Sequence, residues 1–205
     1  FLGRQFIKKH DKLKYGQENV PVSKSPHMFN RIDPYTEEGE KIKRNEIEAG
    51  FAASGTTISL TDNYVYFGVG GSQAAVYRYD QNGMHWDKTN TPIKHGTEGD
   101  GIYSIAFLND NLGLATGGSW EEVQGDSVMA YTTDAGKNWT LVQDTIPNGY
   151  RSCVAWGKLG EKDFAVCCGT SGSDISWDKG KTWSKLNQMN LNVIEFSGNI
   201  GFAAD

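Results

Sequence analysis

A short pattern recurs along this chain and limits the folds that are open to it. The pattern places Ser or Thr, Asp, Gly and Trp at fixed offsets, as in "TTDAGKNW" (132–139) and "SWDKGKTW" (176–183). A weaker copy, "YDQNGMHW" (79–86), keeps the Gly and the Trp but has Gln at the Asp position. The tryptophans of the three copies are 53 and 44 residues apart, a spacing typical of four-stranded propeller blades. The period therefore predicts a series of small antiparallel sheets.

Short β-rich runs separated by turn residues fill each period. The expected strands of the first unit are 56–62, 64–71, 74–80 and 85–90. Those of the second unit are 102–109, 112–118, 127–134 and 138–144, and those of the third are 152–158, 163–169, 173–178 and 181–187. A fourth unit begins at 191–198. The sequence thus predicts an all-β protein, a β-propeller of four-stranded blades, with three blades and the start of a fourth in residues 49–205.

Each copy of the pattern lies between the third and fourth strands of its unit. In such a turn Asp can accept hydrogen bonds from backbone N–H groups, and Gly can adopt a positive φ. The Trp that follows can pack its large face between neighbouring sheets. We therefore interpret the pattern as a structural motif whose members are Asp134, Gly136, Trp139, Asp178, Gly180, Trp183, Gly83 and Trp86.

The pattern S-x-D-x-G-x-x-W resembles the Asp-box, or BNR repeat, of sialidases, sortilin-type receptors and other propellers. Four further stretches are similar to the propeller family known as photosystem II stability/assembly factor-like, whose bacterial members are often labelled oxidoreductases. They are "FAASGTTI" (51–58), "GIYSIAF" (101–107), "YRSCVAW" (150–156) and "GTSGSDIS" (169–176). The resemblance covers about residues 49–205 and implies a propeller of about seven blades that acts as a binding or assembly scaffold.

Three blades and a fragment do not close a propeller ring, and an open ring leaves unpaired strand edges. We therefore expect the remaining blades to come from a longer native chain or from another polypeptide. Residues 1–48 form a polar, basic-leaning leader. Two alternatives are open for this leader, the remnant of an earlier blade with a long connection or a disordered tail.

Charge and cysteine content limit the partners and the compartment. The net charge of −5 argues against nucleic-acid binding, although half of the Lys and Arg residues lie in residues 1–50. There is no apolar run of transmembrane length. The chain begins at Phe1 rather than Met, which is compatible with the removal of a targeting peptide. The sequence therefore does not indicate the compartment. Cys153, Cys167 and Cys168 fit neither a disulfide framework nor a zinc spacing, and we expect small buried thiols.

The sequence argues against an enzyme. Sialidase chemistry implies three arginines around a carboxylate, a Tyr paired with Glu and an Asp acid/base. Of the five arginines, only Arg78 and Arg151 lie within the clear blades. "FGVGGSQAA" (67–75) is Gly-rich but lies at a turn of a sheet rather than at the start of a helix, so it predicts no dinucleotide site. The four histidines show no paired metal spacing. We expect no catalytic residue, no cofactor and no metal.

Binding to a protein partner is the function that the sequence favours. The loops between blades and between second and third strands emerge on one face of a propeller. We expect Trp120, Tyr150 and Arg151 to be the anchors on this face, with an acidic rim of Glu98, Asp100, Glu121, Glu122 and Asp126. The chain is thus predicted to be a non-catalytic scaffold, an assembly factor or a subunit of a larger complex. A sialidase-like glycan-binding or glycan-processing propeller and a sortilin-like receptor domain are the alternatives.

Overall fold

The computed structural model is built from antiparallel β-strands. It describes residues 48–51, 55–122, 124–143, 147–198 and 200–205, and every regular element in these ranges is a strand. The described ranges contain no helix with the length and apolar character that a membrane crossing needs. Residues 1–47 lie outside the described residues, so both alternatives for the leader stay predictions.

The strands form one nine-stranded sheet that contains two blades joined at β3 and β6, a separate four-stranded blade and a final hairpin. Within each blade, every strand pairs with the next strand in the chain. Blade A contains β2 (Ile58–Leu60), β3 (Tyr64–Gly71), β4 (Ala75–Asp80) and β5 (His85–Asn90). Blade B contains β6 (Asp100–Phe107), β7 (Gly113–Ser119), β8 (Met129–Thr132) and β9 (Thr140–Leu141). Blade C contains β10 (Cys153–Leu159), β11 (Lys162–Gly169), β12 (Gly172–Ser176) and β13 (Ser184–Asn187). The final hairpin is β14 (Val193–Ser197) and β15 (Ile200–Ala204), and β1 (Glu48–Ala49) pairs with the end of β3.

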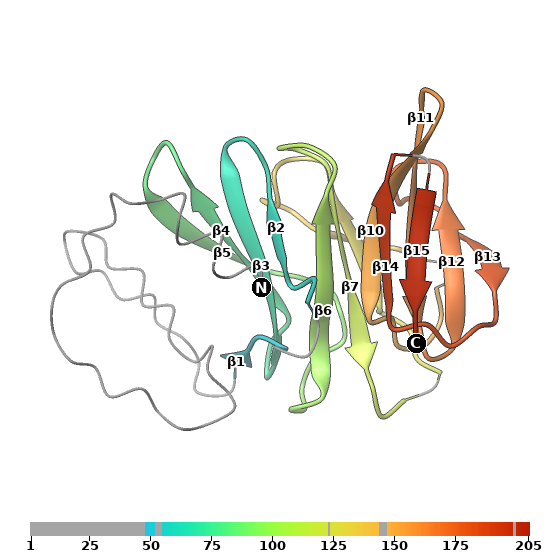
Figure 1. Ribbon diagram of the computed structural model, residues 1–205. Coiled ribbons are helices and arrows are strands. Elements are labelled where there is room, and N and C mark those ends of the chain that lie inside the picture. The colour runs from blue at the N-terminus through green and yellow to red at the C-terminus, as the bar shows by residue number, and fades with distance from the viewer. Residues whose placement is uncertain (1–47, 52–54, 123, 144–146, 199) are drawn as a thin grey trace, which may run out of the picture.

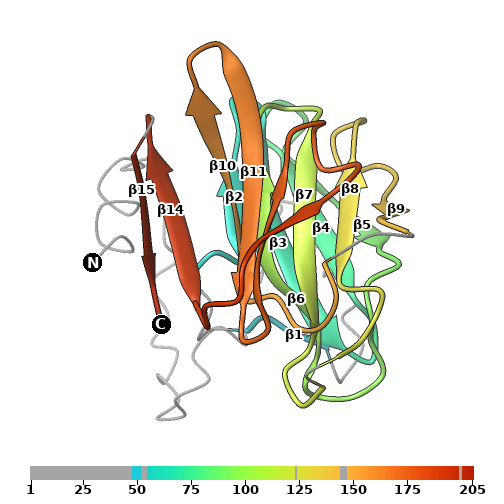
Figure 2. The same ribbon diagram turned by 90° about the vertical axis from the view of Figure 1, so that its right-hand side faces the viewer.

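The sheets are arranged as consecutive sectors of a propeller, as the sequence period predicts. The first strands of neighbouring blades pack on one another, β2 on β6, β6 on β10 and β10 on β14. Figure 1 shows blades A, B and C from left to right, with the final hairpin drawn in front of blade C, and Figure 2 shows β14 and β15 beside β10. Strands β2 to β14 fall within or within two residues of the expected runs, whereas β1 is not among the predicted strands.

Blades A and B approach most closely where two glycines face each other. Gly70 of β3 and Gly101 of β6 form the one ladder position that joins the two blades. A Cβ atom on Gly101 would lie 2.2 Å from Gly70 Cα, and one on Gly70 would lie 2.3 Å from Asp100 O. Gly101 also has a φ of 138°, which side chains with a Cβ rarely adopt. Both positions therefore require glycine.

The core is divided among the interfaces between sheets. Because side chains alternate along a strand, β11 contributes to two interfaces. Ala165 and Cys167 pack with Leu114 of blade B, whereas Val166 and Cys168 pack with Ile194 of β14. A third cluster of the same kind fills the interface between blades A and B around Tyr66, Ile102 and Ala115. Each sheet is thus stabilised mainly by its neighbours along the chain.

The two full copies of the motif form turns with the same hydrogen bonds, and we call them the motif turns (132–139 and 176–183). The Ser176 hydroxyl donates to Asp178 Oδ1 (2.9 Å) and accepts from the Gly180 N–H (2.9 Å). Asp178 Oδ1 accepts from the Thr182 N–H (2.9 Å), and Asp178 Oδ2 accepts from the Thr182 hydroxyl (2.6 Å). Lys179 and Gly180 both have positive φ, 67° and 82°. The carboxylate and the glycine thus have the roles that the sequence predicts.

The first motif turn has the same arrangement around its carboxylate, with one different donor. Thr132 takes the role of the serine, and Asp134 Oδ1 accepts from the Thr132 hydroxyl and from the Asn138 N–H, both at 2.9 Å. Asp134 Oδ2 accepts from the Asn138 side chain at 2.7 Å. Gly136 has a φ of 74°. The side-chain amide of Asn138 thus donates the hydrogen bond that the Thr182 hydroxyl donates in the second motif turn.

The weak copy at 79–86 folds differently, and its interpretation as a third motif turn is wrong. Asp80, one position earlier than the motif requires, accepts from the N–H groups of Asn82 (2.8 Å) and Gly83 (2.9 Å). Met84 rather than Gly83 adopts positive φ, 54°. Trp86 lies within β5, opposite Tyr79, and packs against Phe67. Because residue 81 is Gln rather than Asp, the backbone N–H groups of this turn donate to the carboxylate of Asp80 instead.

Each tryptophan of the two motif turns packs on the preceding blade. Trp183 is 6% exposed and lies in the cluster with Leu114 and Met129 of blade B. Its indole N–H donates to the Gly180 carbonyl at 3.0 Å. Trp139 lies against Phe107 and the blade A core, with ring centroids of Trp139 and Phe107 6.0 Å apart. The motif turn therefore links the last strand of a blade to the blade before it.

Replacing Trp183 by Ala is expected to lower the free energy of unfolding by about 3–5 kcal/mol, because it removes a large side chain from the interface between blades B and C. Urea denaturation measures the loss. Trp177→Ala is the matched control, since Trp177 is 40% exposed, and its cost should stay below about 1 kcal/mol. Equal losses in the two variants would contradict the packing role of Trp183.

The motif turns should also make stability depend on acid. Burial raises the pKa of Asp134 and of Asp178, but hydrogen bonds from Asn138 and Thr182 outweigh it and hold both pKa values below the ordinary 3.8. A carboxyl whose pKa is lower in the folded state stabilises the protein above its unfolded pKa and loses that contribution as pH falls through its folded pKa.

The unfolding free energy of the wild type should therefore fall below about pH 5. The double variant Asp134→Asn/Asp178→Asn should be less stable at pH 7 but lose less stability between pH 5 and pH 2. Urea titrations across this range measure the two slopes. If the double variant loses as much stability between pH 5 and pH 2 as the wild type, carboxyls other than Asp134 and Asp178 cause the pH dependence.

Candidate partner-binding face

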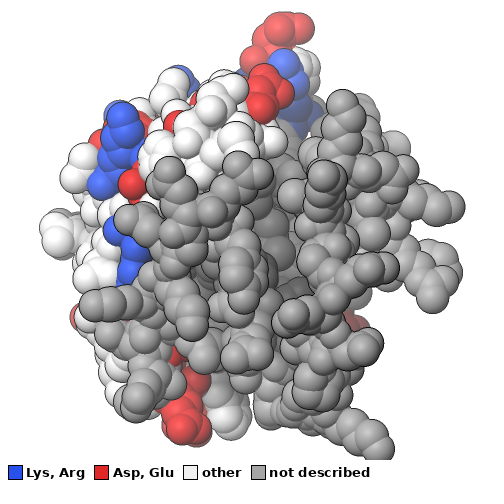
Figure 3. Space-filling model, turned by 90° about the vertical axis from the view of Figure 1, so that its left-hand side faces the viewer, with Lys and Arg blue, Asp and Glu red and all other residues white. Residues whose placement is uncertain are grey.

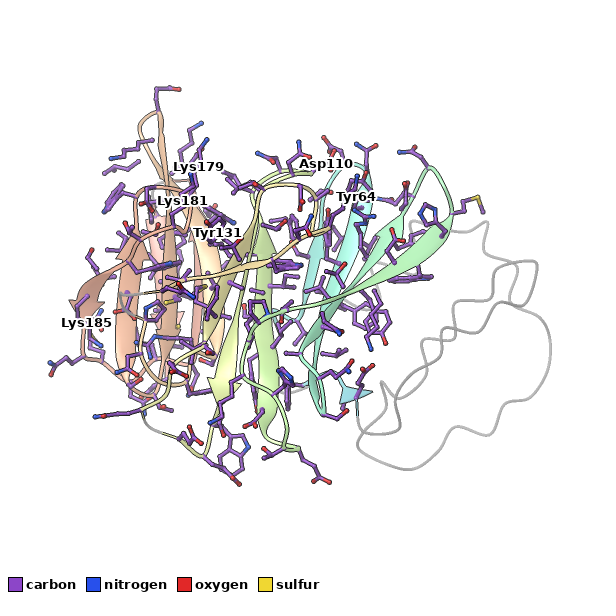
Figure 4. The ribbon with its side chains drawn as sticks, turned by 180° about the vertical axis from the view of Figure 1, so that it is seen from behind. Tyr64, Asp110, Tyr131, Lys179, Lys181 and Lys185 are labelled. Atoms are coloured by element: carbon purple, nitrogen blue, oxygen red, sulfur yellow. The ribbon has the colours of Figure 1, made fainter. Side chains whose placement is uncertain are left out.

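Four loops meet at the end of the sheets that is opposite the motif turns, and we call this surface the loop face. It comprises residues 91–99, 120–128, 147–152 and 170–171, with Val123 outside the described residues. Strands β7 and β11 run towards this end, the lower end in Figure 1. Figure 4 shows Lys179, Lys181 and Asp110 at the other end. The two ends of the propeller thus separate the structural motif from the loops.

Hydrogen bonds connect the loops of the face across blades. The Lys94 N–H donates to the Ser127 carbonyl (2.8 Å), which links the A-to-B connection to the β7–β8 loop. The Gly149 N–H donates to the Gly125 carbonyl (2.7 Å), and the Gly125 N–H donates to Asn148 Oδ1 (3.1 Å). Backbone pairs of this kind hold the loops in a fixed arrangement.

Trp120 is the most prominent apolar group of the loop face. It directly follows β7 and is 60% exposed. Its indole lies over Gly99, where a Cβ atom would come within 2.7 Å of Trp120 Nε1. The Gly99 carbonyl in turn accepts a hydrogen bond from the Tyr103 hydroxyl at 2.9 Å. Trp120 therefore packs on the backbone at Gly99, which is bound by the Tyr103 hydroxyl.

Aromatic rings support this part of the face. Tyr103 stacks on Phe51, with centroids 3.9 Å apart, and meets Tyr150 edge to face at 4.8 Å. Burial, followed by the effect of the neighbouring Cys168, raises the pKa of Tyr150 to about 12, so this hydroxyl stays neutral. Tyr150 is half-buried rather than fully exposed. It supports the face from the side rather than projecting from it.

The acidic rim expected on this face is wrong for Asp100, which is buried. Glu98, Glu121, Glu122 and Asp126 are exposed, whereas Asp100 is buried and accepts a hydrogen bond from the Thr97 N–H at 3.1 Å. Glu122 forms an ion pair with Lys94 at 2.5 Å. The hydrogen bond from Lys94 to Glu122, with the charges of Glu122, Asp100 and Asp126, raises the pKa of Lys94 against the opposing effect of burial. Figure 3 shows one group of Asp and Glu atoms at the lower left of the molecule and others at its top.

The structure corrects the role expected for Arg151. Its side chain is 0% exposed, so it is not a surface anchor. Its Nε and Nη2 groups donate to Asp174 Oδ2 at 3.0 and 2.6 Å, and Nη1 donates to Ser171 Oγ (2.6 Å) and to the Tyr150 carbonyl (3.0 Å). The guanidinium therefore fixes the base of the loop face. A buried guanidinium needs such partners, because an unpaired buried charge is costly.

The residue that sequence reasoning missed is Asp174. It lies on β12 and points into the interface with blade B, next to Cys167, whose thiol approaches Asp174 Oδ2 at 3.9 Å. Asp174 Oδ1 is buried and accepts no hydrogen bond within the described part of the chain. The signal available in the sequence is an Asp inside a β-run and an Arg in the loop before the same blade. No spacing rule joins two residues 23 positions apart.

The arginines of the blades are already occupied. Arg78 forms an ion pair with Asp87, and its Nη1 donates to the Ala135 carbonyl at 3.0 Å. Arg151 is bound by Asp174. Across residues 48–205, apart from the undescribed positions, no three His, Cys, Asp or Glu side chains are placed to hold a metal ion. In the described part of the chain, therefore, neither arginine is free to bind a substrate carboxylate.

Comparison with known proteins shows similarity to solved structures alone. No family model and no curated protein matches the chain. It is similar to the GH74 enzyme of Niastella koreensis, with 18% identity over 65% of this chain and 22% of that one and a TM-score of 0.44. It is also similar to YCF48 bound to a D1 peptide, with 16% identity over 68% of this chain and 42% of that one and a TM-score of 0.37. The matched region thus spans less than half of either protein.

Breaking the Arg151–Asp174 pair should be costly. Asp174→Ala leaves a buried guanidinium without its carboxylate and is expected to lower the free energy of unfolding by about 3–5 kcal/mol. The double variant Arg151→Met/Asp174→Leu should cost clearly less than the sum of Asp174→Leu and Arg151→Met. Lys94→Met is the control, because the Lys94–Glu122 pair is partly exposed and should contribute at most about 1 kcal/mol. Additive losses in a urea-denaturation cycle would show that the two buried charges do not depend on each other.

Proposed function

We propose that this chain is a non-catalytic propeller scaffold that binds a protein partner through its loop face. Trp120 supplies the apolar anchor, and the surrounding carboxylates select a partner with basic side chains. The role is that of an assembly factor or a subunit of a larger complex.

The observation that carries the proposal is the fixed exposure of Trp120. Large aromatic side chains are mostly buried within their own fold, whereas Trp120 is 60% exposed. Here the indole is held over Gly99, which is fixed by Tyr103. A side chain that is already ordered loses little entropy on binding, and tryptophan is among the residues that contribute most to interfaces.

The charge of the face supports a basic partner. Glu98, Glu121 and Asp126 are exposed near Trp120, while Lys94 is paired with Glu122. An acidic rim accelerates the encounter with a basic partner and disfavours acidic ones. Such a rim gives selectivity, whereas the central aromatic gives affinity.

The polar side chains of the loop face are bonded to other groups of the protein, which supports binding rather than a reaction. Glu122 is paired with Lys94, Asp100 accepts from the Thr97 N–H, and Arg151 is bound by Asp174. These contacts shape the loops and leave the groups fixed in structural roles. A surface that is rigid, apolar at its centre and acidic at its rim is suited to docking.

Strand β15 supports the proposed role in a larger complex. It forms an edge of the final hairpin, and Ile200 and Phe202 on it are 56% and 70% exposed. An exposed apolar edge strand invites pairing with a further strand. We propose that additional β-structure covers this edge in the functional protein.

Peptide selection tests the proposal without knowledge of the natural partner. Immobilised full-length chain is presented with a display library of random twelve-residue peptides, and the affinities of the selected peptides are measured by calorimetry. We expect peptides with an apolar residue flanked by Lys or Arg. Trp120→Ala should weaken their binding at least about thirtyfold, since loss of a central anchor costs about 2 kcal/mol or more.

Two controls make the outcome specific. Trp177→Ala removes an exposed tryptophan from the opposite end and should leave affinity unchanged. Glu121→Gln/Asp126→Asn should slow association and weaken its dependence on salt. Selection of acidic peptides, or equal losses from Trp120→Ala and Trp177→Ala, would overturn the proposed face.

A further inference from the structure

Two of the three cysteines face each other across neighbouring strands. The register of β10 and β11 places Cys153 directly opposite Cys168. Both are free and buried in the cluster between blade C and the final hairpin. Directly opposed residues of an antiparallel ladder point to the same face of the sheet, so the two thiols are neighbours. Their separation of 15 positions in the sequence hides this pairing, which only the hairpin register reveals.

The register at this position is compatible with a cross-strand disulfide. Directly opposed residues of an antiparallel ladder have Cα atoms about 4.5 or 5.5 Å apart. A disulfide requires Cα atoms about 4.4–6.8 Å apart. The bond therefore needs a rotation of the side chains and no displacement of the strands.

The third cysteine is excluded from this pair by its face. Cys167 precedes Cys168 on β11 and so points to the other side of the sheet. It lies in the interface with blade B, and its thiol approaches Asp174. Burial raises the pKa of the Cys167 thiol to about 12, so it stays protonated. Cys167 is thus a built-in control, a buried thiol one residue away without an opposed cysteine.

The environment of Cys153 favours its reaction. The hydrogen bond from the Cys168 thiol holds the pKa of Cys153 below its ordinary value, against the opposing effect of burial. The same hydrogen bond, together with burial, raises the pKa of Cys168. The Thr56 hydroxyl also donates towards Cys153 Sγ, at 3.8 Å. Of the two thiols, Cys153 is therefore the one that attacks as a thiolate.

We propose that Cys153 and Cys168 form a redox-modification site, in which a small-molecule disulfide of the glutathione class converts the pair reversibly into a cross-strand disulfide. The disulfide ties β10 to β11 within blade C. Because these strands form the side of blade C that receives β14, the modification lies at the interface between blade C and the final hairpin.

The exchange is balanced in two steps. The Cys153 thiolate attacks one sulfur of the small disulfide, forms a mixed disulfide and releases one small thiolate. Cys168 then gives up its proton to the released thiolate and attacks the Cys153 sulfur, which expels the second small thiolate. The proton that Cys153 gave to solvent on ionisation is taken up by the second small thiolate. The protein thus loses two hydrogens, the small disulfide is reduced to two thiols, and an excess of small thiol reverses both steps.

The final hairpin controls access to the pair. Ile194 and Phe196 of β14 belong to the cluster that covers the two cysteines, and Cys153 Sγ lies 3.4 Å from the Ile194 carbonyl. The oxidant reaches Cys153 only when β14 separates from β10. Weakening this contact should therefore accelerate oxidation without changing its product.

The test equilibrates the folded full-length chain with glutathione buffers of increasing oxidised fraction at pH 8. Acid quenching, alkylation of the remaining thiols with N-ethylmaleimide in denaturant, and peptide mass spectrometry without reduction then identify the products. We expect a Cys153–Cys168 cross-linked peptide, about 2 Da lighter than the sum of its reduced parts, with Cys167 alkylated. Cys167→Ala should give the same product, and Ile194→Ala should form it several-fold faster.

The opposite results are equally clear. Wild-type chain that keeps both thiols free in the most oxidising buffer would overturn the proposal. So would a product that contains Cys167, or a cross-link that forms only in denaturant. Because the primary measurement uses the unaltered protein, the test does not depend on whether a cysteine variant folds.

Discussion

The packing of each blade on the one before it is the constraint on which the rest of the structure depends. A single four-stranded sheet of this size has two faces to cover and little core of its own. The motif turn solves this by placing Trp139 on blade A and Trp183 on blade B, while its Asp and Gly hold the turn closed. With the sheets fixed in this way, the loops at the other end meet and bond to one another. The binding surface is therefore a consequence of contacts made at the far end of the sheets.

Most of the architecture could be predicted from the sequence, because it rests on local signals. Period-2 apolar alternation, turn residues and the spacing of the motif are all readable within about ten residues. The weak copy at 79–86 shows where such reading fails. Gly83 and Trp86 keep their places in the pattern, but the turn is decided by which carboxylate can reach the backbone N–H groups, and Asp80 does so.

The candidate site was only partly predictable, because its chemistry depends on contacts between distant residues. Trp120 and its acidic neighbours are exposed as expected, since a charged insertion between strands has no room in a core. Arg151 is buried because Asp174, on another strand, compensates its charge. The opposition of Cys153 and Cys168 likewise follows from strand register, which fixes partners that sequence spacing alone does not.

The most direct test of the account asks where a bound basic peptide lies. Hydrogen–deuterium exchange of the full-length chain, with and without a peptide selected on it, maps the surface that binding protects. The account predicts added protection in residues 91–99 and 120–122, 124–128, with the motif turns unchanged. Protection centred on residues 176–183, or on β15 alone, would place the docking surface elsewhere and contradict the role assigned to Trp120.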